Sequence, residues 1–186
     1  MEIRHFLPIE LSKYKNYLTD IFNLMQDCDN EFIPALSSRD STQQQKFSNR
    51  KGGSVKIYFD ILAKQENILA IQNSKVIGFM SFIYNYGNND KFKMKNPNDI
   101  NNYITTTIVN KKFRRHGIAT LLYNFIENNL SKSVRPNYIS TRTWHTNFQH
   151  LELLKKRGYE NTLTIKNDRP SPNGELLDTV YYGKRV

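Results

Sequence analysis

A short basic turn contains the residues that most clearly point to chemistry. Arg114 and Arg115 precede Gly117 and Ala119, and the turn joins a threonine-rich segment at 103–109 to an apolar helical pattern. The first N–H groups of a helix have no partners within it, and the helix dipole favours an anion there. Glycine and alanine leave room for a bulky pyrophosphate, and arginine donates charge-assisted hydrogen bonds to phosphate oxygens. The turn therefore predicts a site for a phosphorylated ligand, and a solvated basic turn before an ordinary helix is the alternative.

The elements around this turn predict one mixed α/β domain spanning 1–186, with no visible linker. Helical periodicity recurs three and four residues apart, and strands are rich in β-branched and aromatic residues. A glycine just past a helix end favours the left-handed conformation found there. The pattern predicts helices at 14–25, 55–62, 118–130 and 147–157, strands at 68–71, 76–84, 103–109, 138–143, 161–165 and 178–182, a hairpin turn at 73–75, a polar stretch at 27–53 and an exposed loop at 85–102.

Composition excludes several classes of protein. The hydrophobic share of 38% is enough for a sizeable core, and no apolar run approaches a membrane span. The first residues lack a signal-peptide pattern, so we expect a cytoplasmic protein without membrane contact. The single Cys28 rules out an internal disulfide, and the four histidines lack ligand spacing, so no metal site is expected. The net charge of +10 attracts anions without identifying them.

Two motifs in the same order resemble those of the GNAT N-acetyltransferase family. The first is Arg114-x-x-Gly117-x-Ala119 after a strand, which is similar to the coenzyme A signature of that family. The second is Asn147-x-x-His150-x-x-Leu153-Leu154-x-x-x-Gly158-Tyr159, which resembles Asn-x-x-Ala-x-x-Leu-Tyr-x-x-x-Gly-Phe. The resemblance covers roughly residues 68–182. It implies a GNAT-type fold, with a mostly antiparallel mixed sheet, a splayed parallel pair of strands and flanking helices.

The resemblance also implies acetyl-CoA as co-substrate and direct acyl transfer to a primary amine in a ternary complex. The strand 103–109 would splay from its neighbour and leave backbone groups free for the pantetheine arm. The residues implied to bind the cofactor are Thr107, Val109, Arg114, Arg115, His116, Gly117, Ile118, Ala119, Thr120 and Asn147. A helix N-cap is the alternative role for Asn147, and Thr146 with Gln149 could form a capping box.

The catalytic acid departs from the family pattern. The family often has a tyrosine that protonates the departing sulfur, and Leu154 stands at that position here. Tyr181, Tyr182 and Tyr159 are substitutes, and a core aromatic is the alternative role for each. A thiol has a pKa of about 8.5, so its thiolate leaves tolerably without full protonation.

The acceptor side is expected in the first polar segment. A protonated amine must lose a proton before attack, and Glu31 is a candidate base. Asp29, Glu31, Phe32 and Trp144 are candidate acceptor-binding residues, because acids near apolar groups suit a cationic amine. An ordinary acidic surface loop is the alternative, and Cys28 is expected to be a small buried residue.

Two other functions compete with catalysis. One is an acyl-CoA sensor that no longer catalyses, which Leu154 keeps open. The other is a basic nucleic-acid-binding module, but the aromatics mostly occupy core positions, so no nucleic acid is expected as a partner. The acceptor, a small-molecule or peptide amine, is not identified by the sequence. The resemblance is also compatible with a homodimer.

Overall fold

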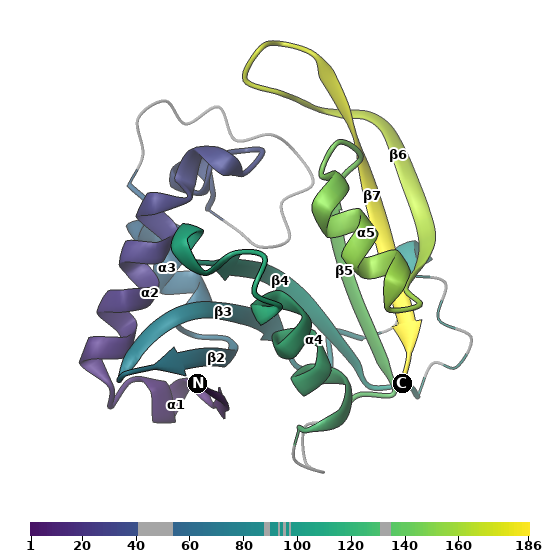
Figure 1. Ribbon diagram of the computed structural model, residues 1–186. Coiled ribbons are helices and arrows are strands. Elements are labelled where there is room, and N and C mark those ends of the chain that lie inside the picture. The colour runs from purple at the N-terminus through teal and green to yellow at the C-terminus, as the bar shows by residue number, and fades with distance from the viewer. Residues whose placement is uncertain (41–53, 88–89, 93, 95, 97, 131–134) are drawn as a thin grey trace.

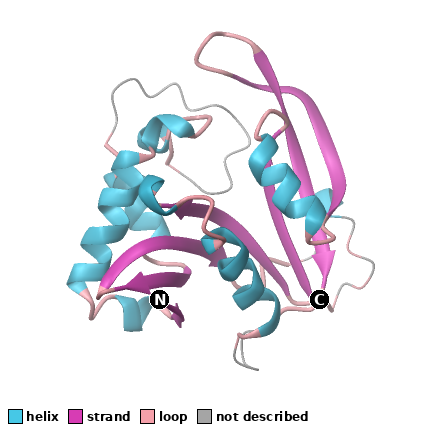
Figure 2. Cartoon of the chain, in the orientation of Figure 1, coloured by secondary structure: helices cyan, strands magenta, loops and turns pink. Residues whose placement is uncertain are grey.

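A seven-stranded mixed sheet forms the centre of the molecule, with strand order β1-β2-β3-β4-β5-β7-β6. The computed structural model describes residues 1–40, 54–87, 90–92, 94, 96, 98–130 and 135–186. The strands are β1 (Glu2–Phe6), β2 (Glu66–Gln72), β3 (Lys75–Ile83), β4 (Asn101–Val109), β5 (Tyr138–Trp144), β6 (Glu160–Pro170) and β7 (Leu176–Arg185). In Figure 2 the chain after the last helix is a long magenta hairpin made of β6 and β7.

Helices cover both faces of this sheet. They are α1 (Pro8–Leu11), α2 (Lys15–Asp27), α3 (Lys56–Leu62), α4 (Ile118–Asn128) and α5 (Phe148–Lys156), with 3₁₀ turns η1 (Asp29–Glu31), η2 (Leu36–Ser38), η3 (Asp90–Phe92) and η4 (Lys111–Phe113). Figure 1 shows α4 and α5 together in front of the sheet. The core of that face includes Ile118, Leu122 and Leu154, whereas Leu24 and Tyr58 belong to the core on the α2 and α3 side. Among the described residues, no helix is long and apolar enough to cross a membrane.

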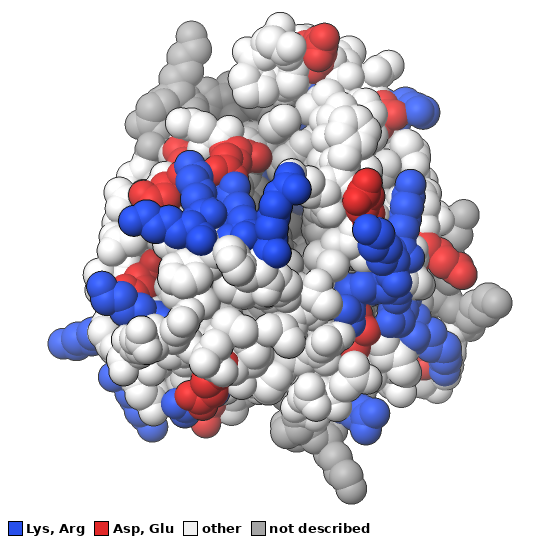
Figure 3. Space-filling view, in the orientation of Figure 1, with Lys and Arg blue, Asp and Glu red and all other residues white. Residues whose placement is uncertain are grey.

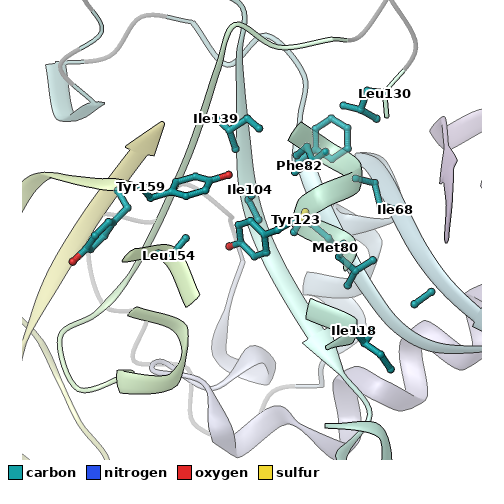
Figure 4. Packing of buried hydrophobic residues seen from close by; sticks show 14 of the residues in the cluster. Ile68, Met80, Phe82, Ile104, Ile118, Tyr123, Leu130, Ile139, Leu154 and Tyr159 are labelled. Atoms are coloured by element: carbon teal, nitrogen blue, oxygen red, sulfur yellow. The ribbon is translucent and has the colours of Figure 1, made fainter. Parts of the chain in front are cut away.

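Local sequence explains the elements that frame the site. Ile118, Leu122 and Ile126 recur every fourth residue, so α4 buries a single apolar stripe against the sheet. Figure 4 shows Ile118 and neighbouring side chains of this core packed between α4 and the strands. Asn73 and Ser74 connect β2 to β3 with φ values of 49° and 59°, the left-handed conformation that tight hairpins require. The predicted hairpin and the predicted α4 are therefore confirmed.

The parallel pair β4 and β5 separates after four residue pairs. Asn101 to Ile104 pair with Tyr138 to Thr141, and the register stops there. At the last pair, the Thr141 Oγ1 donates to the Ile104 carbonyl oxygen at 3.1 Å. Beyond that point the strands diverge, as Figure 1 shows, and the predicted splayed pair is confirmed.

The structure corrects the prediction in two places. β1 was not predicted, because Glu2–Phe6 is a short edge strand that pairs only with β2 among the described residues. The predicted loop at 85–102 is wrong at its end, since Asn101 and Asn102 are buried in β4. Asn-rich composition suggested a loop there, but Asn101 Oδ1 accepts a hydrogen bond from Ser140 Oγ at 2.8 Å. Parts of the predicted loop, and 41–53 of the predicted polar stretch, lie outside the described residues.

Candidate functional site

The gap between the diverging strands opens into a cavity of about 310 Å³. It is lined from one side by α4 and α5, and from the other by the segment around η1 and η2 together with β6 and β7. The free ends of β4 and β5 form its floor. A ligand in this cavity therefore reaches both faces of the sheet through the gap.

The predicted anion-binding turn lies at the start of α4. Arg115 and Gly117 have left-handed φ values of 63° and 78°, a conformation that can turn successive N–H groups toward one side. The helical hydrogen bonds begin with Leu121, whose N–H donates to the Gly117 carbonyl oxygen at 3.0 Å. The N–H groups of Ile118, Ala119 and Thr120 thus precede the first helical bond, and Gly117 provides no capping side chain. Ala119 also lines the cavity.

Basic side chains gather around this turn. Lys111, Lys112, Arg114 and Arg115 occupy four of the five positions 111–115, with Lys111 and Lys112 in η4. Figure 3 shows Lys and Arg side chains clustered over this part of the molecule, beside a hollow that faces α5. The positive potential adds to that of the helix start, which favours a polyanionic ligand here.

Arg114 is held in place by three contacts rather than pointing freely outward. Its Nε donates to the Val109 carbonyl oxygen at 3.1 Å, and its Nη2 contacts Glu31 Oε2 at 2.7 Å and Cys28 Sγ at 3.3 Å. Lys111 Nζ lies 3.0 Å from the other Glu31 oxygen. Arg114 therefore ties the turn to η1, where the acceptor residues were predicted.

These contacts set the charge of Glu31. Partial burial raises the pKa of the Glu31 carboxyl, but hydrogen bonds from Arg114 and Lys111 outweigh burial and lower its pKa below the usual value. Glu31 is therefore ionised at neutral pH and accepts a proton weakly. Burial raises the pKa of the Cys28 thiol, which keeps it neutral.

Two predicted cofactor residues of β4 face the α4 side of the gap. The β3–β4 register shifts between Ser81 and Phe82. After this shift, Thr106 and Ile108 of β4 face α2 and α3. Their neighbours Thr107 and Val109 therefore face the opposite side of the sheet. Both line the cavity. The Thr107 hydroxyl oxygen is buried and has no hydrogen-bond partner among the described residues, so a ligand group could supply one.

Asn147 lines the cavity from the start of α5. Its side chain makes no capping hydrogen bond, and its Nδ2 instead donates to Thr143 Oγ1 at 2.9 Å. The structure therefore does not show the side-chain cap that was the alternative role for Asn147. His116 and Arg115 of the predicted set are exposed on the turn.

A tyrosine–histidine pair inside the cavity was missed by sequence reasoning. Tyr123 Oη and His150 Nε2 lie 2.8 Å apart, joining α4 to α5, and both side chains line the cavity. Figure 4 shows the Tyr123 hydroxyl pointing from α4 toward the side of Leu154. Helical spacing could have placed each side chain on its helix face, because Tyr123 lies four residues after Ala119 and His150 four before Leu154, but it does not show that the two side chains meet.

Burial keeps this pair neutral. Burial raises the pKa of the Tyr123 phenol above its usual value, so the hydroxyl keeps its proton across the neutral range. Burial lowers the pKa of His150 to about 4, so its imidazole is uncharged at pH 7. Tyr123 can therefore donate a hydrogen bond or a proton into the cavity, with His150 holding its hydroxyl.

The tyrosines predicted as acids lie elsewhere. Tyr181 packs against Phe92 and Tyr103, and its hydroxyl accepts a hydrogen bond from Arg142 at 3.4 Å. Tyr182 and Tyr159 belong to the core beneath α4 and α5. The cavity lining among the described residues includes none of these three tyrosines, and their catalytic role stays a prediction.

The predicted acceptor residues come together only in part. Phe32 and Trp144 line the cavity with their ring centroids 6.3 Å apart, and Glu31 joins them. Asp29 instead accepts a hydrogen bond from the Ser37 N–H at 2.7 Å. The acceptor side also contains side chains that were not predicted, namely Arg39, Arg142, Asp168 and Arg169.

Comparison with known proteins gives one family and one fold. The sequence model of the Acetyltransferase (GNAT) family matches residues 19–159. No curated protein shows significant sequence similarity to the chain.

Several solved structures share the fold across the whole chain. The ribosomal-protein-alanine N-acetyltransferase from Brucella melitensis has 16% identity and a TM-score of 0.64, with 100% of both chains covered. A GNAT-family acetyltransferase from Streptococcus pneumoniae has 14% identity and a TM-score of 0.62, with 100% of this chain and 99% of that chain covered. The aminoglycoside 6'-acetyltransferase type Ii has 15% identity and a TM-score of 0.65, with 100% of this chain and 97% of that chain covered. At such identities the likeness concerns the fold.

Proposed function

Because the chain belongs to the GNAT acetyltransferase family and is therefore an acyltransferase, we propose that it transfers an acetyl group from acetyl-CoA to a primary amine by direct attack in a ternary complex. The single observation that carries this proposal is the continuity of the cavity. The basic start of α4 lies at one end, and the cavity passes through the β4–β5 gap toward η1 and η2.

The charge at the start of α4 and the free edge of β4 support a cofactor site in this cavity. Its pyrophosphate would accept hydrogen bonds from the N–H groups of Ile118, Ala119 and Thr120, with Arg115 and the neighbouring basic side chains adding charge. Its pantetheine arm would follow the free edge of β4 beside Thr107 and Val109, where backbone groups have no partner strand. Asn147 would contact the same arm from α5.

The transfer step requires a donor near the departing sulfur. We assign Tyr123 this role in place of the tyrosine that Leu154 replaces, because its protonated hydroxyl lines the cavity and its contact with His150 fixes its orientation. As the amine attacks the thioester carbonyl, the bond between carbon and sulfur breaks and the sulfur takes the Tyr123 proton. The phenolate then regains a proton from solvent, while the neutral His150 imidazole keeps its contact with the phenol oxygen.

The amine must be neutral when it attacks. Glu31 remains the predicted base, although its lowered pKa makes it a weak proton acceptor, and a water route from the cavity is the alternative. Tyr181 and Tyr182 also remain predictions as acids. We also propose a single domain over 1–186, a cytoplasmic location and a homodimer.

The first experiment measures acetyl-CoA binding by isothermal titration, together with release of the coenzyme A thiol in the presence of amines. Ala119→Glu places a carboxylate at the predicted pyrophosphate site, in a first helical turn that tolerates acidic residues. We expect binding to weaken at least about 100-fold, from repulsion between like charges a few ångströms apart.

Leu121→Glu is the matched control. It adds the same charge to α4 at an exposed position that does not line the cavity, and we expect binding within about threefold of wild type. Lack of saturable binding by the folded wild type would refute the proposal. Binding without turnover of any amine would instead favour an acyl-CoA sensor.

A further inference from the structure

The acceptor side of the cavity is rich in guanidinium groups. Arg39 follows η2, Arg142 lies in β5 and Arg169 lies in β6, and all three line the same cavity. Two carboxylates line it as well. Glu31 is held by basic residues of the α4 turn, and Asp168 contacts Arg169 at 3.2 Å. Positive charge therefore exceeds negative charge in this half of the cavity.

Arg169 is fixed by its neighbours without exhausting its donors. Its Nε donates to Thr179 Oγ1 at 2.8 Å, its Nη1 to the Ile33 carbonyl oxygen at 3.0 Å and its Nη2 to Asp168 Oδ2 at 3.2 Å. A guanidinium has five N–H donors in a rigid fork, so these three contacts leave donors for a ligand. The side chain is only 13% exposed, which means a partner here is well shielded from water.

Arg39 is held close to Arg169, because the two side chains donate to the adjacent carbonyl groups of Pro34 and Ile33. Its Nε donates to the Pro34 carbonyl oxygen at 3.0 Å, and its guanidinium carbon lies 5.2 Å from the Phe32 ring and 5.3 Å from the Tyr58 ring. Its Nη1 also donates to Tyr58 Oη at 3.5 Å, and together these contacts orient the fork. The guanidinium is thus placed in advance of any ligand, which reduces the entropic cost of binding.

Arg142 faces the same side of the sheet. Along β5, Thr143 contacts Asn147 of α5, so its neighbour Arg142 faces away from α5 and toward the η1 and η2 side. Its Nη1 donates to Tyr181 Oη at 3.4 Å. Arg142 therefore lies at the floor of the acceptor side, close to the point where β4 and β5 separate.

The three positive charges are close enough to affect one another. Burial lowers the pKa of Arg169, and the charges of Arg142 and Arg39 lower it further, while Asp168 acts in the opposite direction. Holding like charges together in a partly buried cavity costs free energy, and a bound anion offsets that cost.

We propose that the acceptor carries a carboxylate beside its reacting amine, as an amino acid does, and that Arg39, Arg142 and Arg169 bind this carboxylate. The planar guanidinium fork matches a carboxylate in geometry as well as charge. This inference rests on the proposed function, because it takes the η1 and η2 side as the entry of the amine. It reverses the sequence-based expectation that acidic side chains would bind a cationic acceptor.

The test compares amines that differ only in the anionic group. The probes are the common amino acids, the matching amino-acid carboxamides, 1,4-diaminobutane and phosphoethanolamine, each with acetyl-CoA and detection of the released thiol. We expect at least one amino acid to exceed its carboxamide about 10- to 100-fold in kcat/KM, the range for losing a hydrogen-bonded charge pair. Equal rates for acid and amide, or a preference for the diamine or for phosphoethanolamine, would overturn the carboxylate assignment.

Variants locate the effect in the cavity. Arg142→Gln should lower the rate for the amino acid to that for the amide, so that the preference for the acid is lost. Arg39→Gln, in a more exposed segment, repeats the test if Arg142→Gln does not fold. Arg4→Gln in β1 is the matched control, because Arg4 lies outside the cavity lining. If both cavity variants still acetylate the amino acid faster than its carboxamide, the assignment is overturned.

A binding measurement separates this inference from the proposed function. In the presence of coenzyme A, an amino acid should raise the unfolding temperature and its carboxamide should not. If this stabilisation is present and lost in Arg142→Gln, but no thiol is ever released, the carboxylate site is supported and the transferase proposal fails. If amines are acetylated regardless of a carboxylate, the transferase proposal is supported and this inference fails. No stabilisation and no turnover with any amino acid would also overturn it.

Discussion

Replacing Tyr123 by phenylalanine tests the proposed acid most directly. The substitution removes one oxygen, which lies 2.8 Å from His150 Nε2, and keeps the ring that packs 5.7 Å from the Tyr159 ring. Loss of that partly buried hydrogen bond, with the histidine nitrogen left unpaired, should cost about 1–3 kcal/mol of stability. For a chain of this length the unfolding temperature should fall by about 2–10 °C.

The effect on turnover should be larger than the effect on folding. General acids contribute about 100- to 10,000-fold, and a thiolate leaves more readily than an alkoxide, so we expect the lower end of that range. A loss of about 100-fold in kcat corresponds to about 2.7 kcal/mol in the transition state. The KM for acetyl-CoA should change little, because the hydroxyl acts on the sulfur as it leaves.

Tyr159→Phe is the matched control for this prediction. The two tyrosine rings pack together, but the Tyr159 hydroxyl is buried without a hydrogen-bond partner among the described residues and does not line the cavity. Removing it should leave kcat within about threefold and leave stability unchanged or slightly raised. Steady-state thiol release and thermal unfolding measure both variants. A folded Tyr123→Phe enzyme with kcat within about threefold of wild type would refute the assignment.

Three further predictions concern pH, charge and packing. Burial lowers the pKa of His150 to about 4 from 6.5, so the unfolded chain takes up a proton first as pH falls. The free energy of unfolding, measured with urea, should therefore drop by about 3 kcal/mol between pH 7 and pH 4, and by less in His150→Gln. Glu31→Gln should change kcat less than about tenfold, because a carboxyl with a lowered pKa is a poor proton acceptor. A loss of kcat above about 100-fold would instead identify Glu31 as the base. Gly183→Ala should destabilise the protein by about 1–3 kcal/mol in the same unfolding assay, since its new methyl group would meet the Tyr138 hydroxyl; unchanged stability would contradict this packing.

Features written into short stretches of sequence could be predicted. The turn at 114–119 and the hairpin at Asn73 and Ser74 depend on residues whose backbone preferences are local, and the structure has both where the pattern indicated. β1 could not be predicted in this way, because it is defined by pairing with β2 some sixty residues later, as in the pair Ile3 and Ala70. The residues Glu2–Phe6 alternate only weakly between polar and apolar side chains, so they give little indication of a strand.

The acceptor side lay beyond sequence reasoning for a related reason. Arg39, Arg142 and Arg169 come from three distant parts of the chain, and each one alone resembles an ordinary surface arginine. The pair Tyr123 and His150 is separated by 27 positions and meets only where α4 and α5 pack. Helical spacing gives the face on which each residue lies, but not which faces of two helices meet.

The separation of β4 from β5 gives the sheet two additional edges in its interior. Edge strands expose backbone groups that can pair with any extended chain, and proteins usually protect them with charges or covering segments. Here the stretches Thr105–Val109 and Arg142–Trp144 do not pair with each other and line the cavity between them. An extended ligand in that space would act as a guest strand, closing the sheet and shielding both edges from aggregation. The cofactor would then serve the protein as a folding partner as well as a reactant.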